Sequence, residues 1–430
     1  MSPTTSAALV LAVMVAAYIV AKVLKVSTEL SLFAAALAGA LAAGNGIPYR
    51  HIVEGAFTYF DIVLIFITAT LFMNLLKESG AAVFVVRAIL RRFHRHKAPL
   101  FVLLALLLLI PGALTGAGSV TVLIMGGMAA KVLGTMDIPQ PKVAAIIFLI
   151  AGLSAAAPPV NLWAMLTAAG VNMPYVGFFL PLLVPCVILA LLTIFILGWK
   201  SRPVNLEKAL GELPEAPERM NWARVASPFL VFFLFVVAGR VFPFSVPVLG
   251  LPLMFAAAAA AAFVLSPVKI DILRTSRETV HQLLPLIGTL TCAGILVQIM
   301  ALTGVRGLIA ITTVTLPVTV VFLTLFLTLP VSEAVLMWGA APVLGVPLVL
   351  LFNTIGLNPV VALAGMSVIW PLGDAIPPTA IIGRLTTATV GMKEPYPKFL
   401  KYCLVPAVFI AVVGTLMVVF SKKLAFLAVF

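Results

Sequence analysis

Charged residues are scarce in this chain of 430 residues: 10% are Asp, Glu, Lys or Arg, whereas 63% are hydrophobic. A typical soluble domain carries about 25% charged residues, so the composition excludes an ordinary soluble protein. Many apolar stretches reach the roughly 20 residues that a helix needs to cross a bilayer. We therefore predict an all-α polytopic membrane protein, and we expect its first apolar run to be a retained span.

The motifs of common soluble enzymes are also missing. Three cysteines without CxxC spacing and four histidines without ligand-like spacing predict neither a disulfide framework nor a metal centre. There is no phosphate-binding loop, GxSxG or HExxH motif. We predict no enzymatic activity and no organic cofactor. A membrane-embedded acid–base enzyme is the disfavoured alternative, because no nucleophile with an adjacent base accompanies the intramembrane acids.

The chain does contain two proline dipeptides inside apolar segments, Pro158-Pro159 and Pro377-Pro378, separated by 219 positions (377 minus 158). Proline removes a backbone donor and opens a helix. Open backbone in a bilayer is tolerated only where protein or a water-filled cavity satisfies it. Broken helices at matching places in two halves indicate the substrate site of a secondary transporter.

The order of segments around the first dipeptide recurs around the second, which predicts two repeats. The first repeat covers 1–198, a cytoplasmic linker covers 199–224 and the second repeat covers 225–430. Each repeat is predicted to contain scaffold spans, a hairpin and a broken helix. The hairpins are expected at 99–134 and 307–350, with first helices at 99–113 and 307–329, and the broken helices at 143–170 and 358–391.

The net charge of +13 comes from basic residues in short loops, so we interpret it as a topology signal. If each hairpin is re-entrant, each half crosses the membrane five times, and the odd number inverts the second half. The segment 79–93 is expected to lie at the interface, and it ends in a basic cluster at 91–97. With that cluster in the cytoplasm, most other basic loops fall there too. Two full crossings per hairpin give the same parity, but Pro111, Gly112 and the short first helix of the first hairpin favour re-entrance.

The first hairpin tip combines hydroxyls and glycines in Thr115, Gly116, Gly118 and Ser119, with Thr121 just after. Glycines let backbone carbonyls approach an ion, and half-helix ends favour ions of opposite charge. A contact between helices through small residues is the alternative interpretation. We predict a substrate or ion site at this tip.

The first break offers Ser154 and Asn161 beside Pro158 and Pro159, together with free carbonyls. A purely structural kink, in which Asn161 caps the following helix, is the alternative. We include these four residues in the predicted site because broken helices gather at transporter sites.

The second half carries intramembrane acids. Glu333 follows Ser332 at the second tip, and Asp374 precedes Pro377 and Pro378. A charge at the membrane midplane is a functional candidate by default. Asp374 is expected to bind a cation, carry a proton or pair with Arg384, whereas an aqueous hairpin mouth is the alternative for Glu333.

Thr379 and Arg384 follow the second break. Thr379 adds a hydroxyl, and Arg384 is positioned to attract a carboxylate, with snorkelling toward the cytoplasm as its alternative. We predict Na⁺ as the coupling ion, with candidate ligands at Gly116, Ser119, Ser332 and Asp374.

The arrangement resembles the large membrane subunit of tripartite ATP-independent periplasmic (TRAP) transporters, which belong to the ion transporter superfamily. The resemblance covers nearly the whole chain and depends on the order and spacing of several motifs. These are Leu114-Thr115-Gly116-Ala117-Gly118-Ser119, Ala157-Pro158-Pro159, Ser332-Glu333-Ala334, Gly356-Leu357-Asn358-Pro359 and Ile376-Pro377-Pro378.

The resemblance implies an elevator mechanism in the inner membrane of a bacterium or archaeon. It implies Na⁺-driven uptake of small organic anions such as C4-dicarboxylates, with a small membrane subunit and a periplasmic substrate-binding protein as partners. The alternative is a stand-alone carrier of the same superfamily, either an organic-anion symporter or a Na⁺/H⁺ antiporter, that needs no binding protein.

Overall fold

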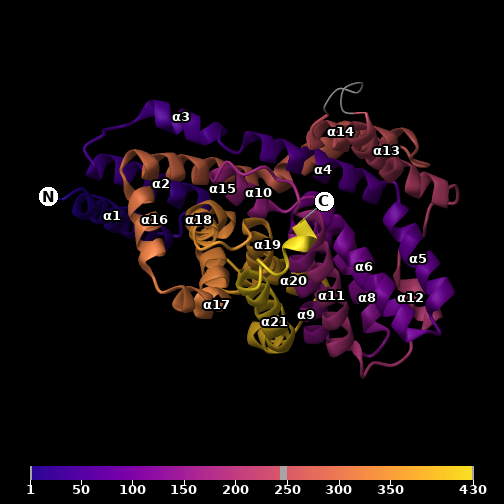
Figure 1. The fold of residues 1–430 in the computed structure, drawn as a ribbon. Coiled ribbons are helices and arrows are strands. Elements are labelled where there is room, and N and C mark those ends of the chain that lie inside the picture. Colours follow the sequence, from indigo (N-terminus) through magenta and orange to yellow (C-terminus); the bar gives the residue numbers. More distant parts are fainter. Residues whose placement is uncertain (1, 243–248, 429–430) are drawn as a thin grey trace.

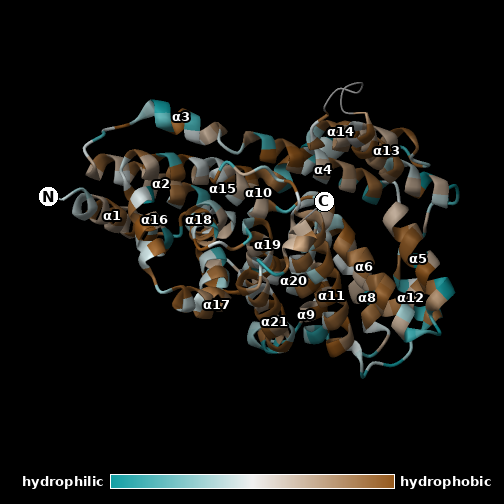
Figure 2. Ribbon diagram, viewed as in Figure 1, coloured by the Kyte–Doolittle hydropathy of each residue, from teal (hydrophilic) through white to brown (hydrophobic). Residues whose placement is uncertain are grey.

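The computed structural model describes residues 2–242 and 249–428, so the predicted boundaries at residues 1 and 430 lie outside it. All regular elements in these two ranges are helical, which confirms the all-α prediction. Within the same ranges, eight helices are long and apolar enough to cross a bilayer. The protein is therefore a multi-pass membrane protein, and apolar residues cover most of its helices (Figure 2).

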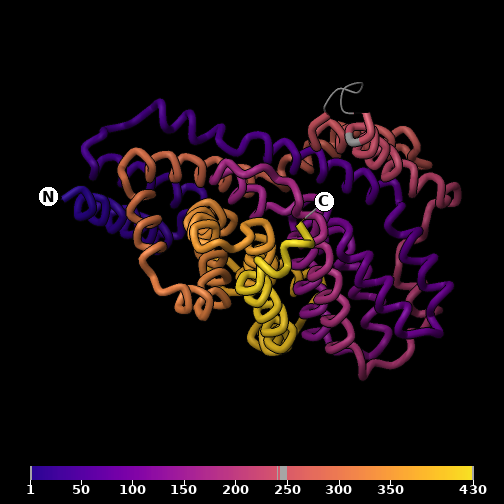
Figure 3. Tube along the Cα trace, viewed as in Figure 1, coloured from indigo at the N-terminus to yellow at the C-terminus, as the bar shows by residue number. Residues whose placement is uncertain are grey.

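Two long helical segments form a scaffold that runs along the molecule (Figures 1 and 3). One is α3 with α4, and the other is α15. Helix α2 packs on α15 and α1 packs on α2, whereas α14 packs on α4 and α13 packs on α14. The scaffold elements are α1 (Pro3–Val23), α2 (Thr28–Ala42), α3 (Tyr49–Phe57), α4 (Phe60–Glu78), α13 (Trp222–Val241), α14 (Leu251–Val264) and α15 (Ile272–Leu302). Glycines let α3 and α15 touch: a Cβ on Gly294 would lie 2.2 Å from the Gly55 carbonyl oxygen.

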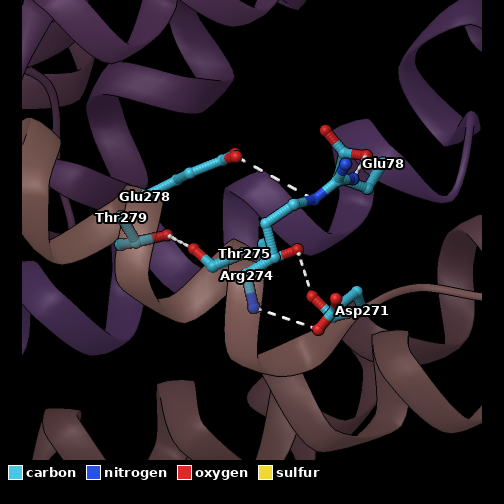
Figure 4. Close-up of polar contacts among 6 residues, drawn as sticks. All are labelled: Glu78, Asp271, Arg274, Thr275, Glu278 and Thr279. Carbon is cyan, nitrogen blue, oxygen red and sulfur yellow. Dashed lines mark hydrogen bonds and ion pairs between the residues drawn. The ribbon is translucent and has the colours of Figure 1, made fainter.

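A polar cluster joins the end of α4 to the start of α15 (Figure 4). Asp271 caps α15 by accepting a 3.0 Å hydrogen bond from the Arg274 backbone N–H. The Arg274 guanidinium lies 3.7 Å from the Glu78 carboxylate. One turn further along, the Asn74 amide donates a 2.8 Å hydrogen bond to the buried Thr279 hydroxyl. Because exposed ion pairs contribute only about 0–1 kcal/mol, the part-buried Asn74–Thr279 bond is the more protected link between these helices.

The remaining helices form two hairpins, two broken helices and their connections, which lie beside the scaffold in Figure 1. The first-half elements are α5 (Ala81–Phe93), α6 (Lys97–Thr115), α7 (Gly118–Thr121), η1 (Val122–Gly126), α8 (Gly127–Gly134), α9 (Gln140–Ala156), α10 (Leu162–Gly170) and α11 (Phe179–Gly198). The second-half elements are α16 (Val305–Thr315), α17 (Val318–Leu336), η2 (Met337–Gly339), η3 (Ala341–Gly345), α18 (Val346–Thr354), α19 (Pro359–Ile369), η4 (Trp370–Ala375), α20 (Ile381–Val390), α21 (Tyr396–Val419) and the terminal η5 (Ala425–Ala428).

Matching features recur in the two halves at one spacing. The π-helical turns η1 and η3 begin at Val122 and Ala341, and the broken helices begin at Gln140 and Pro359. In each case the residue numbers of the two starting positions differ by 219, which is also the separation of the two Pro-Pro pairs. This register supports the predicted repeat, whereas the inversion of the halves relative to the membrane stays a prediction.

The hairpin helices differ in extent from the sequence prediction. The helix expected at 307–329 is divided into α16 and α17, because Pro317 disfavours helical geometry at Leu316, whose ψ is 141°. Helix α16 thus occupies in the second half the place of α5 in the first. Helix α6 has 19 residues, more than the range 99–113 predicted, so its length no longer favours re-entrance over a full crossing.

The expected linker at 199–224 contains a short helix, α12 (Leu206–Glu212), and it docks on the first half. The Arg87 guanidinium donates hydrogen bonds to the Leu210 and Leu213 carbonyls at 3.0 and 3.3 Å. The Lys131 ammonium donates to the Glu212 carbonyl at 2.7 Å. The segment is therefore held against α5 and α8.

Candidate substrate and ion site

The first hairpin tip depends on glycine at three positions. Gly116 ends α6 in the left-handed conformation, with φ 66°, which other residues rarely adopt. A Cβ on Gly112 would lie 1.9 Å from the Ser154 hydroxyl oxygen, and one on Gly118 would lie 2.7 Å from the Ala151 carbonyl oxygen. The tip is therefore pressed against α9, immediately before the first break.

Buried hydroxyls connect this tip to α9. The Ser154 hydroxyl donates to the Ala151 carbonyl at 2.6 Å, so Thr121 is the donor in the 2.8 Å bond between the Thr121 and Ser154 hydroxyls. The Thr121 oxygen in turn accepts the Gly112 backbone N–H at 2.8 Å. Thr115 donates to the Pro111 carbonyl within α6 at 2.7 Å, and Ser119 is half-buried. The hydroxyl hydrogens of Ser154 and Thr121 are thus occupied, and both residues brace the tip.

Asn161 spans the first break. Its amide oxygen accepts the Ala164 N–H at 2.8 Å and caps α10, while its amide nitrogen donates to the Ala156 carbonyl of α9 at 2.7 Å. The Val160 N–H reaches the Ala113 carbonyl of the hairpin at 3.0 Å. The capping interpretation of Asn161 thus agrees with the structure, and the peptide bond between Pro158 and Pro159 is cis.

The second tip holds a fully buried acid. Glu333 in α17 has no exposed surface, and its Oε2 accepts a 2.8 Å hydrogen bond from the Trp163 indole N–H of α10. Its Oε1 has no hydrogen-bond partner among the described residues. Ser332 donates to the Leu329 carbonyl at 2.7 Å and accepts a long bond, 3.3 Å, from the Trp370 indole.

Asp374 faces the same region from η4. It is 4% exposed, and its Oδ2 is buried without a partner within the described residues. The two segments are in close contact, because a Cβ on Gly373 would lie 2.6 Å from the Glu333 Cβ. In the described part of the chain no Lys, Arg or His lies within 4.0 Å of either carboxylate. The pairing of Asp374 with Arg384 that the sequence left open is therefore not observed.

The second break connects this acid pair to α20. Pro377 and Pro378, joined by a cis bond, separate η4 from α20. The Thr379 hydroxyl donates to the Ala334 carbonyl of the tip at 2.9 Å. Arg384 is exposed on α20, so its guanidinium is accessible to an anionic group.

Each broken helix also packs against the hairpin of the other half. Helix α10 packs on η3, and the Thr167 hydroxyl donates to the Ala341 carbonyl at 3.2 Å. Helix α20 packs on η1, where a Cβ on Gly126 would lie 3.6 Å from the Thr389 methyl group. The predicted residues therefore form two groups, one at each tip, that are joined through the crossed broken helices. Gly116 and Ser119 belong to the first group, and Ser332 and Asp374 belong to the second.

Sequence reasoning missed Trp163 and Trp370. Each places an indole N–H on a residue of the second tip. A signal was present, because a buried indole N–H requires an acceptor and acceptors are few in an apolar segment. The identity of the acceptor was not available, since Glu333 lies 170 positions from Trp163.

Comparisons with known proteins inform the fold. No protein-family model and no curated protein sequence matches the chain. Among solved structures, the YdaH transporter of Alcanivorax borkumensis is similar at 14% identity, with a TM-score of 0.62 and coverage of 88% of this chain and 89% of that one. MtrF of Neisseria gonorrhoeae, whose structure is described as illuminating a class of antimetabolite efflux pumps, is similar at 14% identity and the same TM-score, with coverage of 86% and 83%. The chain therefore has a fold found in membrane transporters, and the comparisons do not single out the TRAP type.

Proposed function

We propose that this protein is a secondary active transporter that couples a cation to the movement of a small organic anion. The observation that carries the proposal is the buried pair of Glu333 and Asp374, whose free oxygens have no basic partner within the described chain. Burying a carboxylate without a compensating charge costs about several kcal/mol, even after the protein relaxes around it. A cation that binds between the second tip and the second break would remove that cost and favour the closed hairpin.

Na⁺ is the coupling ion that we propose first. The unpartnered atoms are the carboxylate oxygens Glu333 Oε1 and Asp374 Oδ2. Hard oxygen ligands suit hard cations. A proton would neutralise the same pair of carboxylates, so the transport experiment below distinguishes Na⁺ from H⁺ as the coupling ion.

The substrate that we propose is a small carboxylate, such as a C4-dicarboxylate. Arg384 supplies an accessible guanidinium on α20, which packs against the first hairpin. A guanidinium binds a carboxylate through two parallel hydrogen bonds. Ser119, half-buried at the first tip, adds a hydroxyl to the same group of elements.

In its first form, the proposal makes the chain the large permease subunit of a TRAP-type transporter in a bacterial or archaeal inner membrane. A small membrane subunit and a periplasmic binding protein would then deliver the substrate, and the hairpins would slide along the scaffold. The basis for this form is the resemblance in sequence motifs and their spacing.

In its second form, the chain is a stand-alone carrier, either an organic-anion symporter or a Na⁺/H⁺ antiporter. The fold favours it, because the fold is shared with a protein described as an efflux pump. Export driven by an inward cation gradient would use the same buried acid pair.

Transport into proteoliposomes tests both forms. Labelled C4-dicarboxylates would be offered with an inward Na⁺ gradient, with an inward proton gradient and with neither, each with and without candidate partner subunits. Na⁺-driven uptake that needs the partners supports the TRAP form, and uptake by the chain alone supports the stand-alone form. Ion flux without an organic substrate supports the antiporter. If neither organic-anion transport nor ion flux responds to a gradient, the proposal is wrong.

A further inference from the structure

An apolar groove lies between α5 and α6, away from the acid pair. Its volume is about 400 Å³, which is in the range of ligand pockets, roughly 300–1,000 Å³. Val85, Ile89 and Phe93 line one wall from α5, and Leu103, Leu106 and Ile110 line the other from α6. Leu106 and Ile110 are 36% and 39% exposed, so the groove opens on the outer face of α6, which we expect to face the bilayer.

We propose that this groove binds an anionic phospholipid, with an acyl chain between α5 and α6 and the phosphate on Arg92. The proposal does not depend on the transported substrate. It assigns a role to the basic cluster at the end of α5, which the transport site does not use.

The charge at the edge of the groove supports this choice of ligand. Arg92 lines the groove, is exposed, and makes no hydrogen bond or ion pair with the described residues. Arg87 and Lys97 are already engaged: Arg87 donates to linker carbonyls, and Lys97 donates to the Ser201 carbonyl at 2.8 Å. Arg91 and Arg95 are exposed, but neither lines the groove. Arg92 is therefore the guanidinium at the groove that is available for a phosphate, which a guanidinium binds well.

Trp222 adds a second interfacial feature. It lies at the start of α13, is 58% exposed and lines the same groove. Its ring meets that of Phe84 edge-on, with centroids 5.3 Å apart, so its position relative to α5 is fixed. Tryptophan and arginine at one depth are typical of the headgroup region of a membrane.

The corresponding region of the second half differs in charge from the groove beside α5. We therefore place the lipid site in only one leaflet of the bilayer. Helix α16 is the counterpart of α5, and its single basic residue, Arg306, donates to the Gly170 carbonyl at 2.7 Å. The cavity of about 580 Å³ beside α16 is lined by apolar residues and hydroxyls, without a cation. An anionic headgroup would thus find a partner near α5, on the predicted cytoplasmic side, and not near α16.

The test is a lipid titration of the purified full-length protein, followed by native mass spectrometry. The probes are dioleoyl phosphatidylglycerol and dioleoyl phosphatidylcholine. We expect tighter binding of phosphatidylglycerol, and a loss of about fivefold in its affinity on Arg92→Gln, the factor expected for one cation at a membrane surface. Arg91→Gln is the matched control, because it removes the same charge from the adjacent residue, which does not line the groove.

Two further arms separate a groove from general charge attraction. Ala88→Phe fills the groove with the charge intact, so it is expected to weaken phosphatidylglycerol binding. Glycerol 3-phosphate, which has the headgroup charge without the chains, is expected not to displace the lipid. Equal losses for Arg91→Gln and Arg92→Gln, no loss for Ala88→Phe, or displacement by glycerol 3-phosphate would each overturn the proposal. Thermal unfolding of each variant checks that it remains folded.

Discussion

The two oxygens of Glu333 have different surroundings, and the difference indicates two roles. Oε2 accepts the Trp163 indole N–H at 2.8 Å, which fixes the direction of the side chain. Oε1 is buried and has no hydrogen-bond partner among the described residues. One oxygen therefore orients the carboxyl, and the other remains available for an ion.

We predict that Glu333→Gln abolishes ion coupling but preserves the fold. The amide oxygen of glutamine still accepts the Trp163 N–H, whereas the negative charge that would attract a cation is gone. Gradient-driven transport should fall about tenfold or more, since each tenfold step corresponds to only about 1.4 kcal/mol. Transport with and without the gradient measures this. Glu54→Gln, on an exposed carboxylate paired with Arg50, is the control and should transport normally.

Trp163→Phe should also impair coupling, by a different route. It keeps an aromatic ring in α10 but removes the donor to Glu333 Oε2, and an unsatisfied buried acceptor costs about 1–3 kcal/mol. We expect a lower melting temperature and weaker cation dependence, measured by thermal unfolding across a series of Na⁺ concentrations. Trp199→Phe, at an exposed indole, is the comparison. Identical Na⁺ dependence in both variants would show that Trp163 does not orient the acid.

At the residue scale, the sequence predicted individual candidates better than their contacts. Glu333 and Asp374 stood out because acids are costly in apolar segments. Their proximity could not be derived, since no pattern in the chain specifies that Gly373 packs on Glu333. Asn161 is a different case, because its position after a break and before a helix already offered a cap as the alternative to a site residue.

At the scale of elements, the breaks are held by contacts to the hairpins. Thr379 links the second break to the carbonyl of Ala334, and the Val160 N–H links the first break to the carbonyl of Ala113. The Pro-Pro pairs were sufficient to predict where the helices are interrupted. They could not predict that each following segment packs on the opposite hairpin, because that depends on tertiary contacts such as Thr167 with Ala341.

Gly373→Ala should destabilise the junction between η4 and α17. The new Cβ would lie 2.2 Å from the Pro330 carbonyl oxygen, so backbone must move, and overpacking of this kind typically costs about 1–3 kcal/mol. Gly134→Ala is the matched control, because its Cβ would meet nothing within 4 Å and alanine favours a helix by about 1 kcal/mol. Thermal unfolding in detergent should show a drop for the first variant and none for the second. Equal stability of the two variants would contradict this packing.

At the scale of the whole molecule, the second hairpin contacts the scaffold at an interface that side chains fill only in part. The Tyr18 hydroxyl of α1 donates to the Val335 carbonyl of α17. Beside this bond, an apolar cavity of about 580 Å³ separates α1 and α15 from α17. The lining residues Ile19 and Val331 are exposed, so the cavity is an open cleft and α17 is not close-packed on α1 there. This supports the elevator proposal, in which α17 moves along α1.

We therefore predict that joining α1 to α17 stops transport. In a background without Cys186, Cys292 and Cys403, the pair Tyr18→Cys with Val335→Cys would be joined by a short bifunctional thiol reagent. Under an elevator mechanism, transport should cease on cross-linking and return when a reducible linker is cleaved. The control pair, Glu29→Cys with Gly288→Cys, lies within the scaffold, where a Cβ on Gly288 would be 3.3 Å from the Glu29 Cγ. Cross-linking it should leave transport unchanged. Full transport by the protein with α1 cross-linked to α17 would mean that the second hairpin does not slide on the scaffold.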